Sequence, residues 1–175
     1  MSENKNINVN YNVISNIKDG NIKYISTNMS GKSIINNEMF KYPAETGLKR
    51  MWSNYFNNKF STFSKDTMVI KIQQLDFYIE DVSSTSVGYT VLTGNSKSSV
   101  EVHSKISVVI EYKNKIYERV FDINADDYQE TQSTKYGTYS NTNPNEQKSR
   151  LIQECYNRGI IMIDSYINQI IELEK

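Results

Sequence analysis

The sequence is poor in the residues that build most catalytic and metal centres. It contains one cysteine, Cys155, and one histidine, His103. A single cysteine excludes an intramolecular disulfide. Structural zinc sites need a cluster of cysteine and histidine ligands, which these two residues alone do not supply. We therefore expect no metal and no cofactor, and we predict that the protein is not an enzyme.

Glycine is also scarce, with 7 dispersed residues in a chain of 175. The sequence has neither a phosphate-binding P-loop nor a glycine-rich dinucleotide fingerprint. Neither Cys155 nor any serine lies in a segment that resembles a nucleophile elbow. We therefore expect no catalytic and no cofactor-binding residues.

The chain has no excess of either charge, because Lys plus Arg and Asp plus Glu both total 20. Nucleic-acid binding depends on basic residues that neutralise phosphates, so we expect no nucleic-acid partner. No apolar run approaches the ~20 residues of a membrane-spanning helix. The first residues are polar and Asn-rich and show no export signal.

Alternating polar and apolar residues are abundant and predict β-strands. They indicate a strand over residues 7–13, a turn at Asp19-Gly20 and a second strand over 22–26. A longer strand is expected over 67–80. Its apolar residues change from even to odd positions, which predicts a β-bulge near Gln73-Gln74.

Two further strands form the clearest hairpin in the sequence. Residues 100–112 alternate strictly, and residues 117–123 continue as their partner. Between them, Lys113-Asn114 predicts a tight turn, because Asn tolerates the left-handed backbone that such a turn requires. His103 falls on the polar face of the first of these strands, where we expect a solvent-facing histidine; the alternative is a proton-transfer role.

Two segments have the apolar spacing of amphipathic helices. The first covers about 44–63 and carries an aromatic buried face. The second begins after Asn143, a capping residue, with Pro144 at the first helical position, and continues to the end of the chain. Within it, Cys155 is expected to be a small buried hydrophobe, and Gly159 to allow close approach to the sheet.

These elements predict one α+β domain over residues 1–175. We expect an antiparallel sheet of about four to five strands, with two helices packed on one face and a long C-terminal helix. Residues 1–6 are expected to be disordered, and residues 124–143 to form a long polar loop. Three tyrosines in that loop are the candidate partner contacts, since exposed tyrosine on an adaptable loop is a common recognition device: Tyr128, Tyr136 and Tyr139.

One acidic segment resembles part of a calcium loop. Asp122, Asn124 and Asp126 are spaced D-x-N-x-D, but Asp127 stands where an EF-hand needs glycine and Ser133 where it needs a bidentate glutamate. We interpret the segment as a solvated acidic turn. A second acidic group, at Asp76, Glu80 and Asp81, offers carboxylates for acid–base chemistry, but a polar strand face explains it more simply.

The order of elements, with the segments "TMVIKIQQLDFYIED" and "SSVEVHSKISVVIEYKNKIYERVFDI" before a closing amphipathic helix, resembles the YajG-type bacterial envelope lipoproteins. The related group includes auxiliary lipoproteins of ABC transporters and the lipopolysaccharide-assembly lipoprotein. The resemblance is one of layout and covers roughly residues 45–173. It implies a non-enzymatic periplasmic protein, tethered to a membrane, that assists a transport or assembly machine. The chain itself shows no lipobox cysteine.

We therefore predict a non-enzymatic binding or assembly accessory protein of the bacterial cell envelope. It would be a periplasmic lipoprotein, anchored at the outer membrane, whose signal is not within these residues. Its expected partner is a protein or an envelope lipid component, and it would touch a membrane only through the lipid anchor. The alternatives are a cytosolic interaction or chaperone-like adaptor protein, and an enzyme of unrecognised type around His103.

Overall fold

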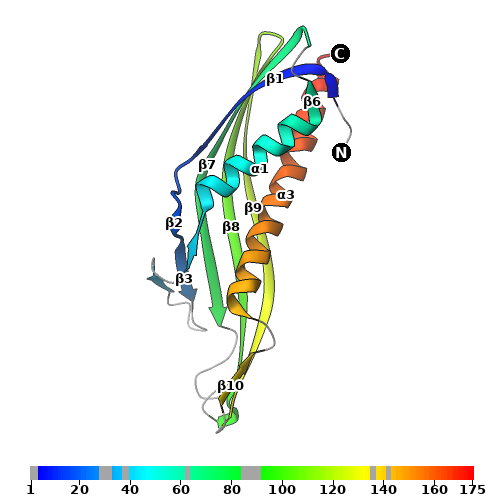
Figure 1. Cartoon of the computed structure of the whole chain (residues 1–175). Coiled ribbons are helices and arrows are strands. Elements are labelled where there is room, and N and C mark those ends of the chain that lie inside the picture. Colours follow the sequence, from blue (N-terminus) through cyan, green and yellow to red (C-terminus); the bar gives the residue numbers. More distant parts are fainter. Residues whose placement is uncertain are drawn as a thin grey trace.

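A long twisted sheet with two helices on one of its faces makes up the protein (Figure 1). The computed structural model describes residues 4–27, 33–36, 40–61, 64–83, 92–134, 137–140 and 143–175. Its principal elements are β1 (Asn4–Ser15), β3 (Lys23–Thr27), α1 (Ala44–Lys59), β7 (Asp66–Ser83), β8 (Asn95–Tyr112), β9 (Lys115–Thr134) and α3 (Pro144–Leu173). Shorter strands are β2 (Gly20–Asn21), β4 (Ser33–Asn36), β5 (Lys41–Tyr42), β6 (Phe60–Ser61) and β10 (Gly137–Ser140).

The sheet is mixed, so the prediction of a purely antiparallel sheet is wrong. β7, β8 and β9 are antiparallel neighbours, but both β1 and β3 run parallel to β7. The chain between β1 and β7 includes α1, and a helical crossover returns the next strand in the parallel direction. Alternation shows which side chains share a face, whereas strand direction depends on the connection. The α+β class and the two helices on one face are as predicted.

The predicted bulge lies in β7. The register with β8 shifts between Gln74 and Asp76, so that Leu75 is the extra residue. The pairing partner of β7 on its other edge changes at the same place. β1 pairs with β7 up to Gln74, and β3 takes over from Tyr78. The bulge therefore marks the point where two parallel strands succeed each other along one edge.

The predicted loop over residues 124–143 is wrong for the part that the structure describes. β9 continues to Thr134, and Gly137–Ser140 return along it as β10. Residues 124–134 keep pairing with β8 up to Asn95↔Gln132. The N-terminal prediction also needs correction, because Asn4–Asn6 belong to β1 rather than to a disordered segment.

The core lies between the sheet and the two helices. α3 ends at Leu173, close to the predicted end, and begins as predicted, with the Asn143 side chain accepting a hydrogen bond from the Asn145 N–H. Cys155 is fully buried, and burial raises the pKa of its thiol to about 12. Gly159 faces the sheet so closely that a Cβ there would lie 2.9 Å from Ile123 Cδ1, which confirms its predicted role.

A buried polar cluster joins the two helices to each other. Lys59 forms an ion pair with Asp164 and donates to the Asn168 side chain at 2.9 Å. The Tyr55 hydroxyl also donates to Asp164, at 2.7 Å, and burial together with this hydrogen bond raises the pKa of Tyr55. Helix α1 ends at Lys59 rather than at residue 63, because Phe60 turns into the extended backbone of β6.

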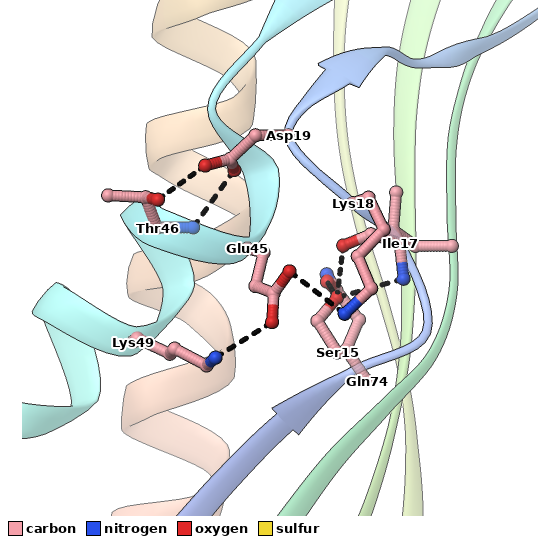
Figure 2. Close-up of polar contacts among 8 residues, drawn as sticks. All are labelled: Ser15, Ile17, Lys18, Asp19, Glu45, Thr46, Lys49 and Gln74. Atoms are coloured by element: carbon pink, nitrogen blue, oxygen red, sulfur yellow. Dashed lines mark hydrogen bonds and ion pairs between the residues drawn. The ribbon is translucent and has the colours of Figure 1, made fainter.

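The start of α1 is held by the segment that follows β1 (Figure 2). Pro43 stands at the N-cap and provides no side-chain cap. Asp19 replaces it, accepting from the Thr46 N–H at 3.0 Å and from the Thr46 hydroxyl. Lys18 and Lys49 both donate to Glu45, at 3.0 and 2.7 Å. Asp19 and Lys18 therefore hold the start of α1 against the segment that joins β1 to β2.

Candidate functional site

The face of the sheet opposite the helices carries the candidate site. The two helices, α1 and α3, both pack on the face of the sheet that lies away from this site (Figure 1). On β8, Val102, Ser104 and Ile106 are buried beneath the helices, and the alternate residues Glu101, His103 and Lys105 point to the opposite side. We call this helix-free side of β7, β8 and β9 the outer face.

Register places the outer-face side chains in rows across the strands. Asp76, Lys105 and Asp122 form one row, and Tyr78, His103 and Asn124 form the next. A hollow of about 410 Å³ lies over these two rows. A second hollow, of about 520 Å³, is lined by Lys18, Lys23 and neighbouring residues and shares Asp76 with the first. Both hollows therefore meet at the bulge of β7, a feature that often re-aims side chains at functional sites.

Two stacked rings form the floor of the first hollow. The rings of Tyr78 and His103 lie 4.6 Å apart with an interplanar angle of 13°. The Lys23 ammonium lies 5.2 Å from the centre of the Tyr78 ring, on the side of β3. The three residues come from three adjacent strands, so the stack spans the centre of the outer face.

His103 lies on the polar outer face, as the sequence predicts, but it is only partly exposed to solvent. Its side chain is 26% exposed, and its Nε2 atom is covered. Nε2 lies 3.4 Å from a Glu101 carboxylate oxygen and 4.0 Å from one of Glu80. Within the described part of the chain, no group forms a hydrogen bond with this nitrogen. This covered nitrogen therefore lies within ion-pairing distance of two carboxylates, those of Glu101 and Glu80.

Three carboxylates form a third row beside the rings. Glu80 is opposite Glu101, and Glu101 is opposite Asp126, on three adjacent strands. Thr27 donates to Glu80 at 2.8 Å. We call Glu80, Glu101 and Asp126 the acidic row. Like charges directly opposite each other destabilise a sheet, so this row is an exception to ordinary strand pairing.

The segment that resembled a calcium loop is part of this face. Asp122, Asn124 and Asp126 are alternate residues of β9, and their side chains point to the outer face from successive positions. Alternate residues of a strand lie ~6.6–6.8 Å apart, which is too far for the three to surround one ion in the manner of an EF-hand. The predicted acidic turn is therefore a strand. No three His, Cys, Asp or Glu residues in the described ranges are arranged to hold a metal ion.

The acidic residues on β7 have different positions. Asp76 accepts from the Phe77 N–H at 2.9 Å at the bulge, and Glu80 belongs to the acidic row. Asp81 lies on the helix side, where it accepts from the Tyr24 hydroxyl at 2.7 Å. The alternation of β7 thus separates Asp81 from Asp76 and Glu80, which both lie on the outer face.

Of the three candidate tyrosines, the two that the structure describes lie in strands and not in a loop. Tyr128 lies on β9 opposite Ser99, is 69% exposed, and extends the outer face beyond Asp126. Tyr139 belongs to β10, where it pairs with Gln132. Tyr136 lies outside the described residues. The role of these tyrosines as partner contacts stays a prediction.

Sequence reasoning missed the acidic row and the ring stack. Tyr78 and His103 are 25 positions apart, and nothing in the local pattern pairs them. The hairpin turn at Lys113-Asn114 was the available signal. Counting outward from it pairs Lys105 with Asp122, His103 with Asn124 and Glu101 with Asp126.

Comparison with known proteins assigns this chain to no family. No family model matches the chain, and no curated protein matches it. A solved structure, described as the crystal structure of an uncharacterized protein, covers 95% of this chain and 94% of its own, with 12% sequence identity and a TM-score of 0.44. Among the helices described, none has the length and apolarity to cross a membrane.

Proposed function

We propose that this chain is a non-enzymatic binding or assembly accessory protein that contacts its partner through the outer face. The observation that carries the proposal is the one-sided cover of the sheet. The sheet is packed by α1 and α3 on one side, and among the described residues no helix packs on the other side of β7, β8 and β9. When only one face of a sheet is packed against the core, the other, solvated face usually carries polar residues.

The composition of the outer face supports binding. It combines charged residues and the two hollows with large exposed apolar side chains, among them Ile116 at 67%, Val120 at 48% and Ile14 at 48% exposure. Protein interfaces have a similar mixture, with apolar contacts beside hydrogen-bonding and charged groups. Tyr128 adds an exposed aromatic side chain, a residue type enriched at interfaces.

Carboxyl footprinting tests the proposal. A carbodiimide and an amine are used to label accessible carboxylates in the purified protein and in the cells that produce it. We expect Asp122 and Asp126 on the outer face to be labelled less in cells, whereas Glu146 and Glu172 on the exposed side of α3 are labelled equally in both. Equal labelling of all four carboxylates would contradict a partner on the outer face.

The cell-envelope setting is part of the proposal and rests on the layout resemblance alone. A cytosolic adaptor would use the same face in the same way. Cell fractionation followed by detection of the chain distinguishes the two settings. Recovery with the membrane or periplasmic fraction supports the envelope role, and recovery with the cytosol supports the adaptor.

A further inference from the structure

We infer that the partner presents Lys or Arg side chains to the acidic row, as part of a basic protein segment laid across the outer face. The inference rests on the proposed function, because it specifies the chemistry of the same face. It is based on the arrangement of charges on β7, β8 and β9 and on the groups that surround these charges.

The acidic row is a local conflict in the sheet. Glu80, Glu101 and Asp126 are in register on strands that lie ~4.8 Å apart, so each carboxylate faces a like charge. Nearby, His103 Nε2 is covered, lacks a hydrogen bond and stands 3.4 Å from Glu101. A sequence chosen only for stability would avoid this arrangement, and such conflicts are expected where a surface has a function.

The charge surplus extends over the neighbouring rows. Asp76 and Asp122 lie on the outer face, on either side of Lys105, which forms an ion pair with Asp122 at 3.8 Å. Lys18 and Lys23 line the hollow that shares Asp76. Five carboxylates therefore stand against three ammonium groups in this region, in a chain whose formal net charge is zero. The surplus favours a cationic partner surface, because complementary charge steers and orients association.

Apolar groups at the margins of this region favour a protein segment over a small cation. Tyr128 lies one row beyond Asp126, and Ile25 lies opposite Glu80 on β3. On the other side of the bulge, Val120 and Ile14 are each 48% exposed. A segment that alternates basic and apolar side chains would place its cations on the acidic row and its apolar groups on these margins.

The first test uses stability as a readout. Glu101→Gln removes the central charge of the row and keeps the shape of the side chain. We expect a higher Tm for this variant, because the repulsion from Glu80 and Asp126 is relieved. A lower Tm would show that Glu101 is a structural partner of His103, and it would overturn the inference.

The second test uses a basic probe on the isotopically labelled whole chain. A short peptide of alternating Lys and Val is titrated and followed by amide chemical shifts in NMR, with a Glu and Val peptide of the same pattern as its control. We expect the Lys peptide to shift amides of β7, β8 and β9 around the acidic row. Its affinity should fall at least about tenfold in an E80Q/E101Q/D126N variant.

A matched variant separates local from global charge. E146Q/E154Q/E172Q changes the net charge equally but lies on α3, and it should bind the Lys peptide as the unmodified chain does. Equal weakening in both triple variants, absence of outer-face shifts with the Lys peptide, or equal shifts with the Glu peptide would each overturn the inference. Shifts of the acidic row with calcium chloride alone would overturn it in favour of a metal site. In each of these cases the footprinting result still decides the proposed function separately.

Discussion

Asp19 caps the start of α1 although it does not occupy the N-cap position of that helix. It accepts the Thr46 N–H of the first turn of α1, and its interactions with Thr46 lower the pKa of its carboxyl below the usual 3.8. A lowered pKa in the folded state means that the charged form stabilises the fold. That contribution is present above the unfolded-state pKa and is lost as the pH falls through the folded-state pKa.

Asp19→Asn isolates this charge, because the amide oxygen can still accept the Thr46 N–H. We expect the variant to be less stable than the unmodified chain at neutral pH, and the difference to vanish as the pH falls below 3.8. Urea unfolding of both proteins over a series of pH values measures this difference. A gap that stayed constant into acid would show that the charge of Asp19 contributes nothing.

Lys59 and Asp164 form the other residue-scale feature with a measurable consequence. Lys59→Met would leave the Asp164 carboxylate buried without its cation, and we expect a loss of ~3–5 kcal/mol in the free energy of unfolding. The double change K59M/D164L removes both charges and should lose less than K59M alone. Urea denaturation of the three proteins checks this order. If the single change cost no more than the double change, the ion pair would not be the main tie between α1 and α3.

At the scale of elements, the approach of α3 to the sheet depends on Gly159. An alanine Cβ at this position would lie 2.9 Å from Ile123 Cδ1. Alanine is otherwise favoured over glycine inside a helix by ~1 kcal/mol. The helix preference favours alanine at position 159, and the close contact with Ile123 opposes it. Only the contact changes when residue 123 is replaced.

A double-mutant cycle separates these effects. Ile123→Val removes the Cδ1 atom, so Gly159→Ala should be stabilising in the I123V protein and less favourable, or destabilising, in the unmodified chain. We expect a coupling of about 1 kcal/mol between the two positions, within the range measured for residues in contact. Thermal or urea unfolding of the four proteins gives this value. A coupling of zero would mean that α3 does not approach β9 as closely as described.

Elements with a local signature were predictable, and those defined by long-range pairing were not. The parity change in residues 67–80 predicted the bulge, and Asn143 with Pro144 predicted the start of α3. The direction of β1 had no local signal, since alternation looks the same in both directions. Residues 124–134 were predicted to be a loop because their only apolar or aromatic residues are Ala125 and Tyr128, which are too few to show the alternation of a strand.

At the scale of the whole molecule, the helices cover one side of the sheet, and the outer face is the side that we propose as the contact surface. The helices cover the side with nearly all of the large apolar residues, and the outer face holds the ring stack, the acidic row and the hollows at the bulge. The candidate site could not be predicted from sequence, because Tyr78, His103 and Glu101 meet only through the register of β7 with β8. The register also explains why no compact motif marks the site.

Site-specific photo-crosslinking tests the role of the outer face most directly. The crosslinking residue p-benzoylphenylalanine replaces Asn124 at the hollow in one protein and Asn157 on the exposed side of α3 in a matched control, and both are irradiated in the cells that produce the chain. We predict a discrete crosslinked product from position 124 that is lost when E80Q, E101Q and D126N are added, and no such product from position 157. Equal crosslinking from both positions, or a product from position 157 alone, would contradict a partner site on the outer face.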